Sequence, residues 1–294
     1  MRRFNLLALL TLSVLNSYGQ ANLILTSGKV IPYMKMEAQP GYLNVWESFS
    51  REKIEIAIDS VVGYYKFGEE ADILRIKVPD NSGDTDIDYQ FLPYGAPGKI
   101  KTYSYRVDYQ KGPDGKPLEY FYIGKDDRLA MLFPYSFGSS KAKSMDTLKT
   151  YVADQPEIVQ AITADSYTLE NVRRLINQYN LLSFTPRASA DDPQGVVTFY
   201  RMKKGELRGP LTMTIDDKAY TFTPYQTINV NVSTLNPVKL CVGEEGNMLC
   251  ELIQGIPYFR TYFKVGLSKD RQPSIERINK TRAFEDIKIL KQFQ

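Results

Sequence analysis

Residues Val196–Gly266, VVTFYRMKKGELRGPLTMTIDDKAYTFTPYQTINVNVSTLNPVKLCVGEEGNMLCELIQGIPYFRTYFKVG, decide the fold class of this chain. Short runs of β-branched and aromatic residues alternate there with turn residues about every eight to twelve positions, which is typical of a small sandwich or barrel. The stretch therefore predicts a β-sandwich module over residues 195–270. A strand and a helix over residues 271–294 are expected to follow it as a tail.

Two polar stretches divide the chain on the N-terminal side of this module. Residues 79–88 (PDNSGDTDID) and 185–194 (TPRASADDPQ) are rich in Pro, Ser, Asp and similar residues, as linkers are. They delimit a small β domain over residues 20–78, in which about five short strands predict a small barrel or a rolled sheet. Trp46, the only Trp, is expected to anchor its core, and a Trp that stacks on a ligand is the alternative interpretation.

The middle region, residues 89–184, begins with a hairpin. The runs KIKTYSYRVDY and LEYFYIG flank the turn Gly112–Gly115. The alternation of a strand places Tyr103 and Tyr105 on one face, where Tyr120 and Tyr122 of the second strand can pair with them. These four tyrosines are the candidate partner-binding residues. Cross-strand packing beneath a neighbouring segment is the competing interpretation.

Beyond the hairpin the apolar period changes from two residues to 3.6. It predicts a helix over Lys141–Ala153, a second opened by a capping box at Asp154, and a third capped by Thr168. Each helix is apolar on one side only, so the helices are expected to lie on the Tyr-rich hairpin. The predicted fold class is therefore mainly β with a small α segment.

The N-terminus has the pattern of a cleaved signal peptide. A basic start at Arg2 and Arg3 precedes the apolar run Phe4–Leu15, and small residues then precede a cleavage position before Gln20. The run is shorter than the ~20 residues that span a bilayer. Residues 1–19 are thus predicted as a leader, and the mature chain as an exported protein with no transmembrane segment, in the periplasm, on the outer surface or secreted.

Composition excludes several function classes. The 294 residues contain no His, which excludes Ser-His-Asp and Cys-His catalysis and zincin-type sites. The net charge of +3 falls almost to zero when the leader arginines are removed, so no electrostatic case for nucleic acid exists. Neither Gly-rich phosphate loop pattern occurs. No cofactor, metal or catalytic residue is predicted.

Three weaker patterns leave alternatives open. Asp84, Asp86 and Asp88 resemble the first half of a calcium loop, but its later Gly and Glu positions hold Tyr89 and Gly95. The S-x-x-K pattern at Ser140–Lys143 lacks the companion motif of penicillin-binding enzymes. The many acidic residues would permit a carboxylate pair for glycoside hydrolysis, although no spacing marks one.

The two cysteines give conflicting signals. An exported chain with Cys241 and Cys250 on adjacent strands favours a disulfide. A four-residue turn, Glu244–Asn247, places the two Cys opposite each other but pairs Leu240 with Glu251. A five-residue turn gives a cleaner apolar face and separates the two Cys. Both registers remain open, and a bulge would reconcile them.

Short stretches across the mature chain resemble exported multi-module β proteins of Gram-negative bacteria that end in a β-sandwich domain of unknown function. These proteins are often lipid-anchored, but no Cys follows the apolar leader run here. The resemblance implies export and a modular β fold and transfers no catalytic residue. The matching stretches are LTSGKVI (25–31), IDSVVGY (58–64), GKIKTY (98–103), YFYI (120–123), YVADQPE (151–157), NQYN (177–180), VTFYR (197–201) and IDDK (215–218).

The sequence thus favours a non-enzymatic cell-envelope or secreted protein whose modules bind a protein, a peptide or a glycan. A carbohydrate-active enzyme with two catalytic carboxylates is the first alternative. A structural envelope component that assembles through exposed strand edges is the second.

Overall fold

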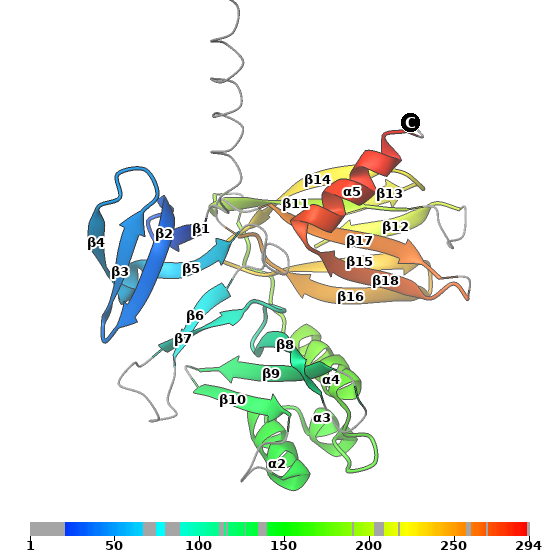
Figure 1. The fold of residues 1–294 in the computed structure, drawn as a ribbon. Coiled ribbons are helices and arrows are strands. Elements are labelled where there is room, and N and C mark those ends of the chain that lie inside the picture. Colours follow the sequence, from blue (N-terminus) through cyan, green and yellow to red (C-terminus); the bar gives the residue numbers. More distant parts are fainter. Residues whose placement is uncertain are drawn as a thin grey trace, which may run out of the picture.

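The chain folds into three β-rich parts that meet at the centre of the molecule (Figure 1). The computed structural model describes residues 21–66, 75–79, 89–111, 115, 117–126, 128–134, 140–189, 191–202, 209–216, 218–256, 260–268 and 270–292. Within these residues the fold is mainly β with four helices, as predicted. The predicted leader and the Asp84–Asp88 stretch lie outside the described residues.

The N-terminal sheet has seven antiparallel strands in the order β4-β3-β2-β1-β5-β6-β7. Its inner face carries one apolar cluster, to which Leu23, Ile31, Leu43 and Val45 contribute. Residues 80–88 lie outside the described part, and the strand beyond them, β7, pairs with β6 in the same sheet. The strands are β1 (Ala21–Leu25), β2 (Val30–Gln39), β3 (Tyr42–Glu47), β4 (Lys53–Ala57), β5 (Val61–Lys66), β6 (Arg75–Pro79) and β7 (Tyr89–Pro93).

This sheet is rolled but does not close into a barrel. The Tyr89 hydroxyl on edge strand β7 donates to the carbonyls of Gln39 (3.2 Å) and Tyr42 (3.4 Å), at the β2–β3 turn. No ladder joins edge strands β4 and β7 in the described residues. The roll therefore brings β7 over the β2–β3 hairpin, and within the described residues the sheet takes the rolled form of the two predicted, not the closed barrel.

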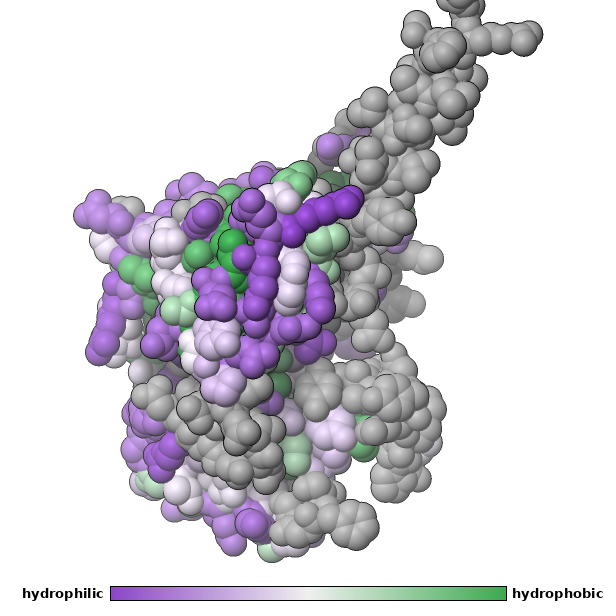
Figure 2. Space-filling view, turned by 60° about the vertical axis from the view of Figure 1, so that its left-hand side comes forward, coloured by the Kyte–Doolittle hydropathy of each residue, from purple (hydrophilic) through white to green (hydrophobic). Residues whose placement is uncertain are grey.

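Trp46 does not anchor the core of this sheet, contrary to expectation. The indole is partly exposed on the outer face, with Lys35 Nζ 4.5 Å and Lys53 Nζ 5.8 Å from the ring centre. The neighbours Leu43 and Val45 point inward instead, because side chains alternate along β3. Figure 2 shows the molecule from this side, where hydrophilic residues predominate and hydrophobic ones are scattered among them.

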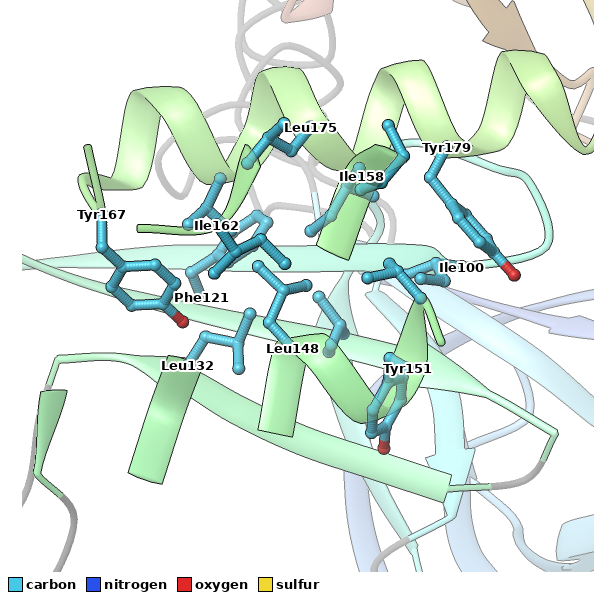
Figure 3. Close-up of a cluster of buried hydrophobic side chains, with 14 residues drawn as sticks. Ile100, Phe121, Leu132, Leu148, Tyr151, Ile158, Ile162, Tyr167, Leu175 and Tyr179 are labelled. Atoms are coloured by element: carbon cyan, nitrogen blue, oxygen red, sulfur yellow. The ribbon is translucent and has the colours of Figure 1, made fainter. Parts of the chain in front are cut away.

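The middle layer consists of a three-stranded antiparallel sheet covered on one face by helices (Figure 1). The predicted hairpin is present as β8 (Lys101–Lys111) and β9 (Pro117–Lys125), and β10 (Arg128–Phe133), which was not predicted, extends it. The helices are α2 (Lys141–Tyr151), α3 (Pro156–Ala161) and α4 (Leu169–Leu182). Figure 3 shows Leu175 and Tyr179 of α4 pointing towards the strands that carry Phe121 and Leu132.

Helix starts in the middle layer follow the sequence signals with one exception. The side chains of Ser140 and Thr168 accept hydrogen bonds from the first turns of α2 and α4. The S-x-x-K pattern is thus a helix cap, since Ser140 Oγ accepts from the backbone N–H of Lys143. Asp154 does not cap α3, whose N-cap residue is Gln155; its carboxylate is used elsewhere.

The C-terminal part is the predicted β-sandwich. Its sheets have the orders β14-β11-β17-β18 and β13-β12-β15-β16, and their inner faces share one apolar core containing Phe199, Met213, Leu240 and Val265. The elements are β11 (Gln194–Tyr200), β12 (Leu211–Ile215), β13 (Lys218–Phe222), β14 (Thr227–Ser233), β15 (Val238–Glu244), β16 (Asn247–Ile253), β17 (Thr261–Leu267), β18 (Pro273–Ile278) and α5 (Lys280–Leu290).

Strands β15 and β16 adopt the register that places the two cysteines opposite each other. Cys241 pairs with Cys250 and forms a disulfide, while Leu240 pairs with Glu251. The apolar face is thereby interrupted by the carboxyl of Glu251. The register with the uninterrupted apolar face is not adopted.

Specific contacts join the three parts. Ile24 of the N-terminal sheet packs on Ile256 after β16. The amide of Asn177 on α4 donates to the carbonyl of Cys250 (2.9 Å), and Arg277 on β18 donates to the carbonyl of Tyr94 (2.9 Å). None of the described helices is long and apolar enough to cross a membrane.

Candidate functional site

The four candidate tyrosines pair across β8 and β9. Tyr103 is opposite Tyr122, and Tyr105 is opposite Tyr120. Tyr103 is only 4% exposed, whereas Tyr120 and Tyr122 are half-buried. The side chain of Tyr105 lies outside the described part. The strand register therefore sets Tyr103 beside Tyr122 and Tyr105 beside Tyr120, and the side chain of Tyr103 is buried.

The helices cover the opposite face of this sheet from the one that carries Tyr103. Phe121 and Ile123 point towards the helices and belong to the helix-covered core (Figure 3). Tyr103 packs instead with Val78 and Leu92 of the N-terminal sheet. The covering segment is thus β6–β7, not the predicted helices.

The ring of Tyr103 is buried, but its hydroxyl reaches the cleft described below. The hydroxyl has no protein hydrogen-bond partner among the described residues, and it is not one of the buried polar atoms left without a partner. Burial raises the pKa of the phenol to about 12, so the group is a neutral donor at physiological pH. A Cβ atom built on Gly124 would lie 3.7 Å from this oxygen, so the hydroxyl sits beside the strand position opposite Lys101.

A cleft of about 700 Å³ opens at this hydroxyl, where the three parts of the molecule meet. Its size is within the range of small-molecule sites, ~300–1,000 Å³. The apolar lining comes from all three parts: Leu25, Val62, Ile76 and Val78 from the N-terminal sheet, Tyr103 and Leu129 from the middle layer, and Leu235 and Ile256 from the sandwich. Leu235 is 63% exposed, so the cleft is open on that side.

Basic residues gather at one rim of the cleft. Lys99, Lys101, Lys125 and Arg128 lie at the same end of the middle sheet, because Lys101 pairs with Gly124 and Arg128 pairs with Lys125. Lys77 lines the opposite wall, where it donates to the carbonyl of Ile58. Asp126 is the one acidic residue among the described lining residues. The cleft is therefore cationic at one end and apolar over the rest.

Asp154 holds two of these cations away from the open rim. Its carboxylate accepts from Lys99 Nζ (2.5 Å), Lys125 Nζ (3.2 Å) and the Tyr179 hydroxyl (2.9 Å). The hydrogen bond from Lys99, followed by those from Tyr179 and Lys125, lowers the pKa of Asp154 far below its usual range despite some opposing desolvation. Lys125 is further fixed by the carbonyl of Tyr151 (2.6 Å).

Lys101 and Arg128 remain without an anionic partner among the described residues. Neither forms an ion pair there, and both side chains are exposed. Arg128 lies 5.7 Å from the ring centre of Tyr151, which leaves its guanidinium hydrogen bonds available. The rim thus offers two positive charges: Lys101 on the face that carries Tyr103, and Arg128 on the helix-covered face at the same end of the sheet.

A smaller cavity of about 190 Å³ lies between β16, β17 and the Tyr94–Pro97 segment. Glu251 lines it, and burial raises the pKa of this carboxyl to about 7. Thr261 Oγ1, also in the lining, has no partner among the described atoms. One carboxyl alone does not supply the pair that glycoside hydrolysis needs.

The described residues contain no cluster of three or more His, Cys, Asp or Glu side chains placed to hold a metal ion. Comparison with protein-family models, curated proteins and solved structures finds no match.

Most of the residues that line the cleft could not be predicted from the sequence. Tyr103 was singled out, and its strand neighbour Lys101 shares its face by simple alternation, so this pair carried a signal. Arg128, Leu235 and Val78 come from distant segments that only the tertiary fold brings together.

Proposed function

We propose that this chain is an exported, non-enzymatic binding protein whose ligand enters the cleft between its three parts. The observation that carries the proposal is the cleft of about 700 Å³, with the Tyr103 hydroxyl at its wall and no protein partner for that hydroxyl among the described residues. A ligand acceptor placed there would gain a hydrogen bond inside a largely apolar enclosure. Three converging walls provide the enclosure that a small ligand requires.

Export is supported by two independent features. The first 19 residues have the pattern of a cleaved leader. The disulfide between Cys241 and Cys250 forms in oxidising compartments such as the periplasm or the medium. The exported β proteins that several stretches resemble fit the same assignment. Cell fractionation of the full chain tests it, and retention in the cytoplasm with the leader uncleaved would contradict it.

The binding function is best tested by a ligand screen with a matched pair of leucine variants. Leu235 and Leu182 are both exposed, at 63% and 52%, so Leu→Ser at either position should leave the fold intact. Only Leu235 lines the cleft. A thermal-shift screen against peptides, oligosaccharides and small amphiphiles should yield ligands that bind at least roughly tenfold more weakly to L235S, because apolar burial is lost.

The L182S variant should bind the same ligands as the native chain does. Ligands recovered unchanged after incubation would agree with a non-enzymatic role. A screen in which L235S and L182S behave alike for every ligand would show that the cleft is not the site, and turnover of a ligand would contradict the non-enzymatic part of the proposal.

A further inference from the structure

The cleft has the chemistry for one particular class of ligand. Its positive charge and its apolar surface are separated: the cations lie at the β8–β10 end, and the aliphatic side chains lie on the walls contributed by β5, β6 and the sandwich. We propose that the ligand is a small anionic amphiphile, a molecule with one phosphate or carboxylate group and an apolar body. The inference rests on the proposed function and specifies its ligand.

Two side chains define the anion position. Lys101 and Tyr103 share one face of β8, two residues apart, and Gly124 on the neighbouring strand lies beside the Tyr103 hydroxyl. Arg128 lies at the same end of the sheet, but its pairing with Lys125 places its side chain on the helix-covered face, over the Tyr151 ring. An anion beside Lys101 would accept from its ammonium and from the phenol, two donors that have no protein acceptor among the described residues.

Asp154 does not neutralise the positive charge at this position. It binds Lys99 and Lys125, whose side chains are 45% and 10% exposed, and so pairs with the two lysines nearest to α3. Its carboxylate is not part of the cleft lining. The positive charge that remains on the Tyr103 side of the rim therefore belongs to Lys101.

The apolar body would lie against Val78, Leu129 and Leu235. These side chains line the same cleft from the three different parts of the molecule. Leu235 is a large hydrophobic residue left 63% exposed, which a bound alkyl or aryl group would cover. A purely polar anion would leave this apolar surface exposed to water, and a neutral apolar molecule would offer no acceptor to Lys101 and Tyr103.

Calorimetric titration of the full chain with three probes tests the proposal. Octyl phosphate, below its micelle concentration, carries both features, whereas octan-1-ol and inorganic phosphate each carry one. Octyl phosphate should bind at least roughly tenfold more tightly than either of the others, since each feature contributes separately. Equal affinity for octan-1-ol and octyl phosphate would overturn the inferred anion preference.

Conservative variants locate the anion. Tyr103→Phe removes only the hydroxyl and Lys101→Gln only the charge, and each should weaken octyl phosphate binding roughly tenfold without changing octan-1-ol binding. Lys288→Gln, an exposed lysine on α5 that is remote from the cleft lining, is the control and should change neither affinity. Unchanged octyl phosphate affinity in both cleft variants would overturn the assignment.

A second arm separates a free molecule from a membrane surface. Vesicles of phosphatidylglycerol offer the same anion with its apolar body packed away, so the native chain should bind octyl phosphate without sedimenting with them. Sedimentation that persists in Lys101→Gln would place anion recognition elsewhere on the surface and contradict the proposal. If a neutral ligand binds in a Leu235-dependent way, the proposed function stands and only the ligand class is wrong.

Discussion

The ring of Tyr103 lies against Gly124 on the neighbouring strand, with no room between them for a branched side chain. A Cβ atom at position 124 would already be 3.3 Å from Tyr103 Cε2. Gly124 therefore allows Tyr103 to lie flat at the cleft wall. This contact between the ring and Gly124 fixes the direction of the Tyr103 hydroxyl and leads to the first prediction.

We expect Gly124→Val to destabilise the protein by about 1–3 kcal/mol, because the added methyl groups overpack the Tyr103 ring. Urea unfolding measures the change. In a Tyr103→Ala background the same substitution should cost much less, since the clashing ring is absent. Equal costs in the two backgrounds would show that the valine clashes with something other than Tyr103.

Asp154 joins the hairpin to the helices, so replacing it should destabilise the fold. We expect Asp154→Asn to reduce the free energy of unfolding by about 1–2 kcal/mol, because Lys99 and Lys125 lose their charged acceptor. Asp146→Asn, on the exposed side of α2, is the matched control and should change stability little.

The difference in unfolding free energy between the native chain and Asp154→Asn should depend on pH in one definite direction. Because the pKa of Asp154 is lower in the folded protein than its ordinary value of 3.8, its stabilisation is fully present above that value. It is lost only as the pH falls from 3.8 towards the folded pKa. Unfolding curves of the native chain and Asp154→Asn should therefore differ by a constant amount from pH 7 to about 4. A difference that shrinks between pH 7 and 5 would assign the effect to another group.

The elements of the fold could be predicted where the signal is local. The helix from Thr168 has a side-chain cap and apolar residues on one face, and the hairpin has alternating tyrosines, so both were located within a few residues. Asp154 shows the limit of local rules: its position before Pro156 resembles a cap, but its carboxylate instead binds Lys99, just before β8, and Lys125, the last residue of β9.

Long-range pairing accounts for the rest. Nothing in the sequence near Tyr89 shows that its strand joins β6 or that its hydroxyl reaches the β2–β3 turn. The helices were expected to cover Tyr103 because they follow it in the chain, but Val78 and Leu92 cover it instead. A cleft assembled from three separate parts has no sequence pattern of its own.

The Cys241–Cys250 disulfide should contribute measurably to stability. It closes a loop of nine residues in sequence separation, for which chain entropy gives roughly 2–3 kcal/mol. We expect the Cys241→Ala/Cys250→Ala double variant to unfold at lower urea concentration by that amount. A reductant should lower the stability of the native chain alone. Sensitivity of the double variant to reductant would contradict this assignment.

Glu251 should make the protein less stable as the pH rises from 4.5 to about 7. The β15–β16 register places this carboxyl opposite Leu240, on the face that builds the sandwich core, and burial raises its pKa from 4.5 to about 7. Between these two values the folded protein holds a proton that the unfolded chain has released. The free energy of unfolding therefore falls with rising pH across that window and then levels off.

We expect Glu251→Gln to remove this dependence, because the amide has the size of the acid and never ionises. The variant and the native chain should have similar stabilities near pH 4, and at pH 8 the variant should be more stable by at most about 3 kcal/mol. Urea unfolding from pH 4 to 8 measures both, with Glu285→Gln on the exposed side of α5 as the control. If Glu251→Gln instead shows the same decline with pH as the native chain, another buried group carries the dependence, and the Leu240–Glu251 pairing is not the source of the destabilisation.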